Sequence, residues 1–159
     1  MHTTSCSFTV RHATIADAHH VAECVDAAFE KWIPVIGRKP GPMLDDYRTI
    51  IGNEIVFVAE QDGRIVGLLV LAQDAEGFLL ETVAVHPRAS GRGIGRVLLA
   101  LAEDQAKARG HAEIHLYTHE LMASNIALYE RAGYVEYARR VESGLARIYM
   151  RKQLRRADT

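Results

Sequence analysis

Residues 83–99, VAVHPRASGRGIGRVLL, pass from an apolar strand through a proline and three alternating glycines into a helix. The glycines Gly91, Gly93 and Gly95 stand where the helix begins. Glycine lets the backbone approach an anion closely, and the free N–H groups and dipole of a first helical turn bind pyrophosphate oxygens. Arg92 and Arg96 would add positive charge at the rim. The pattern predicts an anion-binding loop at residues 91–96, which includes the amide of Ile94.

Other glycine loops fit this stretch less well. A Rossmann loop needs a third glycine where this chain has Arg96, and it follows the first strand of a βαβ unit. A nucleotide P-loop needs a Gly-Lys-Ser/Thr ending, which is absent. A loop whose glycines only permit a tight turn remains an alternative.

Before the loop, hydrophobic spacing predicts two helices and then three strands. Thr14 and Asp17 form a plausible capping box, and apolar residues at helical spacing follow until Pro34 ends the helix. The second and third strands of the meander are apolar on both faces, so they should lie at the centre of a sheet covered on two sides. The predicted elements are a strand at 8–11, a helix from 18 to 32, a loop at 37–42, a short helix from 43 to 51 stopped by Gly52-Asn53, and strands at 55–61, 64–73 and 78–85.

After the loop, the pattern predicts a long helix from Ile94 capped by Gly110, and then a strand, a helix and a closing hairpin turned at Ser143-Gly144. These last elements are expected at 112–118, 124–132, 134–141 and 146–150. The order is β-α-α-β-β-β-α-β-α-β-β. We expect a single α/β domain over residues 1–159, with a mixed, mostly antiparallel sheet of about seven strands and helices on both faces.

Composition excludes several classes of protein. The 159 residues are 48% hydrophobic and 25% charged, with a formal charge of −1, so no basic surface for nucleic acid is expected. The basic run at 151–156 is interpreted as a solvated tail. Cys6 and Cys24 give no disulfide framework, and no apolar run or leader pattern indicates a membrane or secretion. We expect a cytoplasmic protein, with a homodimer as one possible assembly.

Two segments resemble the GNAT superfamily of N-acetyltransferases. Residues 80–99, LETVAVHPRASGRGIGRVLL, resemble its acyl-CoA segment, in which a Gln/Arg-x-x-Gly-x-Gly/Ala loop grips the pyrophosphate of coenzyme A. Gly93 and Gly95 occupy the last two positions, and Ser90 stands where the family usually has Gln or Arg. Residues 125–134, NIALYERAGY, are similar to the family's Asn…Tyr-Glu-x-x-Gly segment, and residues 11–18 resemble its opening.

The resemblance covers about residues 8–152 and implies an activity. Acetyl-CoA would donate an acetyl group to a primary amine of a small molecule or peptide, by direct attack in a ternary complex and without a metal. In the family, the strand before the loop pairs with the pantetheine arm, which here implies the backbone of Val83, Ala84 and Val85. One of these amides would serve as the oxyanion donor. A non-catalytic acyl-CoA-binding module of the same fold is the alternative.

Proton transfer requires a donor and an acceptor. Asn125 and Tyr129 lie four apart on one helix, so an amide that contacts the cofactor and a phenol near its sulfur can share a face. Tyr129 is the candidate acid, with a packed core tyrosine as the alternative. Glu81 shares a strand face with Val83, and burial there would raise its pKa toward that of a base. A structural glutamate or a water relay remains open.

The predictions about an acceptor pocket and about a metal site depend on weaker sequence patterns. By the resemblance, the first two helices wall an acceptor pocket, which implies Phe29, Trp32 and Tyr47, although ordinary packing explains such residues too. His111, His115 and His119 are four apart, but a strand followed by a loop would keep the last two from converging on a metal.

Overall fold

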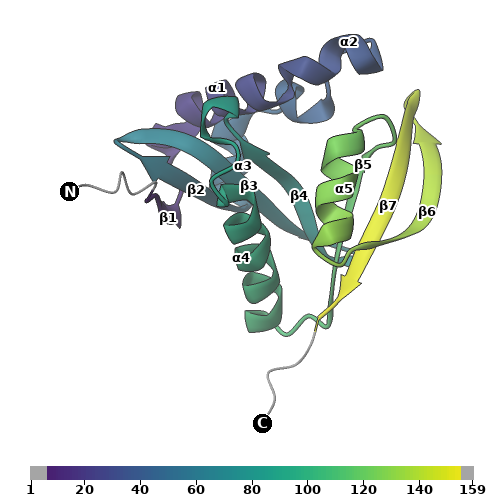
Figure 1. The fold of residues 1–159 in the computed structure, drawn as a ribbon. Coiled ribbons are helices and arrows are strands. Elements are labelled where there is room, and N and C mark those ends of the chain that lie inside the picture. The colour runs from purple at the N-terminus through teal and green to yellow at the C-terminus, as the bar shows by residue number, and fades with distance from the viewer. Residues whose placement is uncertain (1–6, 155–159) are drawn as a thin grey trace. The chain divides into compact units, whose positions relative to one another are not determined.

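The computed structural model describes residues 7–154, which form a mixed α/β fold (Figure 1). Seven strands lie in one sheet, as the sequence predicted, and their order across the sheet is β1-β2-β3-β4-β5-β7-β6. The strands are β1 Thr9–His12, β2 Ile55–Gln61, β3 Arg64–Asp74, β4 Gly77–Val85, β5 Glu113–His119, β6 Val135–Glu142 and β7 Leu145–Gln153. The helices are α1 Ala18–Phe29, α2 Ile33–Ile36, α3 Tyr47–Asn53, α4 Ile94–Ala108 and α5 Ala123–Arg131, with 3-10 turns η1 Ile15–Asp17, η2 Glu30–Trp32, η3 Gly41–Leu44 and η4 Pro87–Ala89.

The sheet is mostly antiparallel. β1 pairs with β2, β5 with β7 and β6 with β7 in antiparallel fashion, whereas β4 and β5 are parallel. β3 and β4 are interior strands, and their fully buried runs explain the apolar pattern on both of their faces. No helix within residues 7–154 is long and apolar enough to cross a membrane. Of the basic run at 151–156, residues 151–153 belong to β7 and residues 155–156 lie outside the described part, as does Cys6.

The contacts divide the chain into two compact units, and each is described by itself. Unit 1 comprises the residues up to Val70 together with Thr82–Leu98, and unit 2 comprises Leu71–Glu81 and the residues from Leu99 onward. β3, β4 and α4 therefore each contribute residues to both units.

In unit 1, the first turns of α4 and the helix α1 pack on opposite faces of β3. Gly67 faces α4, since a Cβ atom built on it would lie 3.0 Å from Ile94 Cγ2 and 3.3 Å from Leu98 Cδ1. The next residue back, Val66, points to the other face of the strand and lines a cavity together with Cys24 of α1. This close approach at Gly67 sets the start of α4 directly against the strand.

Two helix boundaries differ from the prediction. Pro34 does not end the first helical segment, because it stands in the first turn of α2, where its missing N–H is not needed, and Gly37 ends that segment at a φ of 90°. The short second helix begins at Tyr47 rather than at residue 43. Asp46 caps it by accepting from the amides of Arg48 and Thr49, and the preceding apolar residues form the separate turn η3.

In unit 2, β6 and β7 form the predicted closing hairpin. Ser143 and Gly144 make its turn with φ values of 52° and 76°, which is the left-handed geometry of a tight hairpin. The Lys152 ammonium on β7 donates to Glu103 Oε2 of α4 at 3.0 Å and to the Ala132 carbonyl after α5 at 2.7 Å. A single side chain therefore ties both helices to the same face of β7.

Candidate functional site

The loop between β4 and α4 is held in shape by its own hydrogen bonds. The Ala89 amide donates to the His86 carbonyl at 2.9 Å, and the Ser90 hydroxyl donates to the Pro87 carbonyl at 2.9 Å. Ala89 is 2% exposed and anchors the turn η4 in the core. Ser90, the residue that departs from the family pattern, is exposed and closes the turn η4 through its hydroxyl.

The three glycines of this loop differ in whether the backbone conformation requires glycine at their positions. Gly91 and Gly93 adopt φ values of 78° and 83°, a left-handed conformation that disfavours other residues, and a Cβ on either would meet open space. Gly95 already has an ordinary φ, and a Cβ there would lie 3.7 Å from Val85 Cγ2. Backbone conformation therefore requires the first two glycines, whereas Gly95 lies in the helix beside the end of β4.

The start of α4 presents unpaired backbone donors. The Val97 amide donates to the Gly93 carbonyl at 3.1 Å, which makes Gly93 the residue that opens the helix. The amides of Ile94, Gly95 and Arg96 precede this first helical bond and have no carbonyl in their own helix. Three donors and the positive end of a 15-residue helix suit an anion with several oxygens, such as a pyrophosphate. The exposed Arg96 lies within the same turn.

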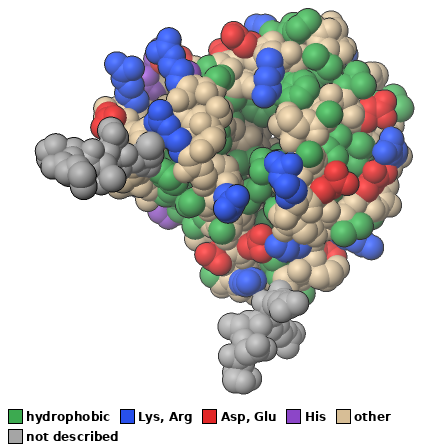
Figure 2. Space-filling view, viewed as in Figure 1, with side chains coloured by type: hydrophobic (Ala, Val, Ile, Leu, Met, Phe, Trp, Pro, Cys, Tyr) green, Lys and Arg blue, Asp and Glu red, His purple; other side chains and the backbone are tan. Residues whose placement is uncertain are grey.

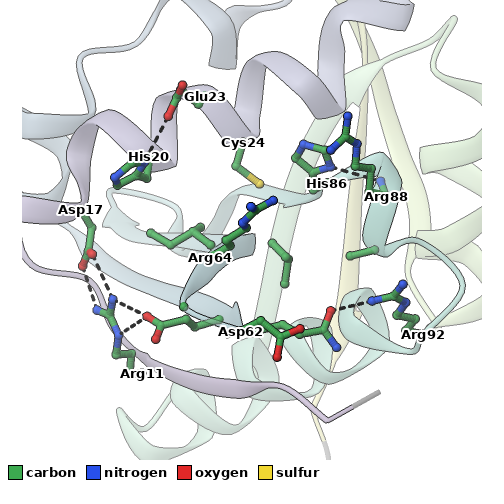
Figure 3. A pocket seen from close by; sticks show the side chains of 16 residues that line it. Arg11, Asp17, His20, Glu23, Cys24, Asp62, Arg64, His86, Arg88 and Arg92 are labelled. Carbon is green, nitrogen blue, oxygen red and sulfur yellow. Dashed lines mark hydrogen bonds and ion pairs between the residues drawn. The ribbon is translucent and has the colours of Figure 1, made fainter. Parts of the chain in front are cut away.

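A cavity of about 780 Å³ adjoins this loop within unit 1 (Figure 3). Its walls come from α1, β1, the β2–β3 turn and the loop itself. Arg92, predicted at the rim of the glycine loop, is fixed on this side because its Nη1 donates to Gln61 Oε1 at 2.6 Å. Arg64, His86 and Arg88 also line the cavity.

At one end of the cavity, Arg11 forms ion pairs with both Asp17 and Glu60. Arg11 Nη1 and Nη2 donate to Asp17 Oδ2 and Oδ1 at 2.8 and 3.0 Å, and Nη2 also donates to Glu60 Oε1 at 2.8 Å. The Arg11 guanidinium holds the pKa of Asp17 at about 2, well below the usual range of a carboxyl group. The Asp17 carboxylate also accepts from the Thr14 amide at 2.7 Å, as part of the predicted capping box of Thr14 and Asp17.

Cys24 lines the same cavity but is not poised for nucleophilic chemistry. Its side chain is 2% exposed, and burial raises the pKa of its thiol to about 12. Because the thiolate is the reactive form, this cysteine stays inert near neutral pH.

Unit 2 carries Asn125 and Tyr129 on α5, as predicted from their spacing. The Asn125 amide donates to Met122 Sδ at 3.8 Å. Tyr129 is 6% exposed, its ring lies 6.0 Å from that of Tyr134 in an edge-on arrangement, and burial raises the pKa of its hydroxyl. The phenol therefore stays protonated at neutral pH, as a proton donor must.

The residues of β4 differ in their surroundings. Glu81 is half-buried, and Val83 and Ala84 are buried. Among the described residues, β4 pairs with β5 at Phe78↔Ile114 and Leu79↔His115. The three residues predicted to meet the pantetheine arm, Val83, Ala84 and Val85, come after the last of these pairs.

Other candidates occupy packed positions. Phe29, Trp32 and Tyr47 are buried in unit 1, the Tyr47 hydroxyl donates to the Pro42 carbonyl at 2.7 Å, and none of the three lines the cavity.

His119 ends β5 rather than lying in the loop that follows, which corrects the prediction. Residues 7–154 hold no group of three or more His, Cys, Asp or Glu side chains that could bind a metal.

Sequence reasoning missed Arg64, His86 and Arg88. Arg88 and His86 flank the proline before the glycines, so their place beside the loop could have been noticed. Arg64 follows the Asp62-Gly63 turn more than twenty positions earlier, and only the folded hairpin brings it to the same cavity.

Comparison of the chain with known proteins identifies its relatives. The model of the Acetyltransferase (GNAT) family matches residues 21–134. The chain is 38% identical over 94 residues to an IAA acetyltransferase of Azospirillum brasilense, covering 57% of this chain and 61% of that protein. The matched stretch spans 28% to 61% of the length of the first curated relatives.

Solved structures share the fold. A PaiA N-acetyltransferase of Thermoplasma acidophilum, in complex with coenzyme A, superposes with a TM-score of 0.75 at 21% identity, covering 92% of this chain and 99% of that one. A putative streptothricin acetyltransferase of Bacillus anthracis, in complex with acetyl coenzyme A, gives 0.74 at 19% identity, covering 93% and 100%. The family model spans well over half of the chain, glycine loop and α5 included, and the chain therefore belongs to the GNAT family of acetyltransferases.

Proposed function

We propose that this protein is an acetyl-CoA-dependent N-acetyltransferase that acetylates a primary amine of a small molecule or peptide. The observation that carries the proposal is the loop at residues 91–96, where two left-handed glycines lead into three unpaired helix amides. Such donors bind pyrophosphate without charged side chains. The coenzyme A and acetyl coenzyme A complexes of two structural relatives support the same ligand for this loop.

In this proposal β4 holds the reacting end of the thioester. The backbone of Val83, Ala84 and Val85, beyond the last β4–β5 pair, hydrogen-bonds the pantetheine arm, and one of these amides donates to the oxyanion. The neutral amine attacks the thioester carbonyl, so that a C–N bond forms and the C–S bond breaks. Holding the two reactants together supplies much of the rate enhancement.

Two side chains would handle the protons. Glu81, directly or through water, accepts the proton that the amine loses on attack, and Tyr129 donates a proton to the departing thiolate. Burial raises the pKa of the Tyr129 hydroxyl, so the phenol is protonated before the transfer but is a weaker acid than an exposed tyrosine. Asn125, one helical turn earlier, contacts the cofactor.

The acceptor is an amine whose identity a screen must find. Phe29, Trp32 and Tyr47 shape the acceptor region by supporting its walls from the core, since all three are buried. Amino acids, polyamines, aminoglycosides and peptide N-termini should be incubated with acetyl-CoA while released thiol is measured. Binding of acetyl-CoA without turnover on any amine would favour the non-catalytic acyl-CoA-binding module.

A matched pair of glycine variants tests the loop. Gly93→Asp places a side chain and a negative charge beside the helix amides, and should abolish acetyl-CoA binding in calorimetry. Gly110→Asp is the control, because Gly110 has the same φ of 83° and equally open surroundings but follows the far end of α4. Equal affinity in the two folded variants would remove the loop from the proposal.

A further inference from the structure

The sulfur of Met122 accepts two hydrogen bonds at the point where helix α5 begins. Thr118 Oγ1, on strand β5, donates to it at 3.5 Å, and Asn125 Nδ2, on α5, donates to it at 3.8 Å. Met122 is 4% exposed and Thr118 is 8% exposed, so little water can compete for the sulfur. Because a thioether only accepts, the two donors occupy both of its lone pairs.

The backbone holds Met122 on both sides. Its amide donates to the His119 carbonyl at 3.0 Å. Met122 is also the N-cap of α5, and its carbonyl accepts the first hydrogen bond of that helix from the Ile126 amide at 3.0 Å. A methionine side chain is flexible, with three rotatable bonds. Burial and these two backbone bonds fix the place of the sulfur despite that flexibility.

The sulfur determines which way the Asn125 amide faces. An asparagine side chain has an NH2 group that donates and an oxygen that accepts. Because the sulfur only accepts, Nδ2 must face Met122, and Oδ1 lies on the other side of the planar amide. Asn125 is half-buried, and no donor to its Oδ1 is found among residues 7–154. This oxygen is therefore available to a group from outside the chain.

The surroundings of α5 favour an uncharged group at this oxygen. Figure 2 shows charged side chains of both signs over α5, β6 and β7, on the right of the view. Charges of mixed sign produce no strong field that would draw in an ion. The pantetheine arm of acetyl-CoA is uncharged, and its amide N–H and hydroxyl groups can donate to a neutral amide oxygen.

We propose that Met122 is a positioning residue for the acetyl donor. Its thioether, held by Thr118, orients Asn125 so that Oδ1 accepts a hydrogen bond from an N–H or O–H group of the pantetheine arm. Met122 itself touches no cofactor and acts through Asn125. The inference rests on the proposed function, in which Asn125 contacts the cofactor.

The test is a double-mutant cycle on acetyl-CoA affinity. Met122→Leu nearly conserves the side-chain volume and removes the acceptor, and Asn125→Ala removes the amide that it orients. Met150→Leu is the matched control, since Met150 is 1% exposed, lies on β7 of the same unit, and accepts no hydrogen bond at its sulfur from the described residues. Calorimetry gives the Kd of each single and double variant, and steady-state kinetics with an amine from the screen gives kcat.

Met122→Leu should raise the Kd of acetyl-CoA about three- to tenfold, the scale of one neutral hydrogen bond. In the Asn125→Ala background it should change Kd by less than about twofold, because no amide remains to be oriented. At saturating acetyl-CoA, kcat should stay within about twofold of wild type, since the lost interaction acts on binding. Met150→Leu should leave Kd unchanged in both backgrounds.

The proposal is overturned if Met122→Leu leaves Kd unchanged. It is also overturned if Met122→Leu weakens binding equally with and without the Asn125 side chain, because the sulfur would then act through packing alone.

NMR of the free protein separates this inference from the proposed function. The side-chain amide protons of Asn125 should exchange with solvent faster in Met122→Leu than in wild type or Met150→Leu, because the hydrogen bond to the sulfur is lost. Equal exchange in all three proteins overturns the positioning role whether or not acetyl-CoA binds. A protein that binds no acetyl-CoA instead loses the proposed function and the ligand assigned to Oδ1, even where NMR shows that Met122 holds Asn125.

Discussion

Gly67→Ala should weaken the protein at the contact between β3 and α4. The added Cβ would lie 3.0 Å from Ile94 Cγ2, 3.2 Å from the Ala84 carbonyl oxygen and 3.3 Å from Leu98 Cδ1. The two side chains can shift, but the carbonyl belongs to the backbone of β4. Overpacking of this kind costs about 1–3 kcal/mol, and the reduced freedom of the unfolded chain returns about 0.4–1 kcal/mol.

The free energy of unfolding should therefore fall by about 1–2 kcal/mol, and Tm by roughly 2–8 °C for a chain of this size. Urea and thermal unfolding measure both. Gly41→Ala is the matched control, since its Cβ would meet nothing within 4 Å, and it should change stability by less than about 0.5 kcal/mol. Because Ile94 lies in the first turn of α4, acetyl-CoA affinity should fall in Gly67→Ala as well. Identical unfolding free energies for the two variants would refute the packing argument.

Tyr129→Phe should lower kcat by roughly 10²-fold with little change in acetyl-CoA affinity, and near-normal turnover in steady-state kinetics would reduce Tyr129 to a packing residue. Glu81→Gln should remove the acidic limb of the kcat/KM profile, because an amide cannot titrate, whereas an unchanged limb would assign it to another group. Asp17 has a folded pKa of about 2 against an ordinary value of 3.8, so its contribution to stability is complete above about pH 4 and is lost as the pH falls toward 2. Asp17→Asn should flatten the loss of stability over that window in urea titrations, and an unchanged slope would show that other carboxylates cause it.

Hydrophobic spacing was sufficient to predict the seven strands and their order of connection. Hydrophobic residues recur every two positions in strands and about every 3.6 positions in helices. This spacing is a local property of the sequence, so it can be recognised without knowledge of the fold. Helix boundaries were less well predicted. Pro34 was expected to end a helix and instead stands in the first turn of another, because a proline is compatible with either position.

The candidate site, too, could be predicted from the sequence only in part. The glycine loop was visible in sequence, since Gly91 and Gly93 are required by local backbone conformation. The cavity beside it was not, because only the folded chain brings Gln61 of β2 to Arg92 of the loop, 31 positions away. Glu81 and Tyr129 were predicted from their strand face and helix spacing, and their chemical roles stay predictions.

The ion pair and hydrogen bond of Lys152 bear on which of the protein's own amines could be acetylated. An acetyl acceptor needs a free lone pair, but the Lys152 ammonium is committed to Glu103 and to the Ala132 carbonyl. Lys31, Lys39 and Lys107 are exposed instead. In a protein that encounters acetyl-CoA continually, these three would accumulate acetyl marks, whereas modification of Lys152 would require its ammonium to leave Glu103 and the Ala132 carbonyl first.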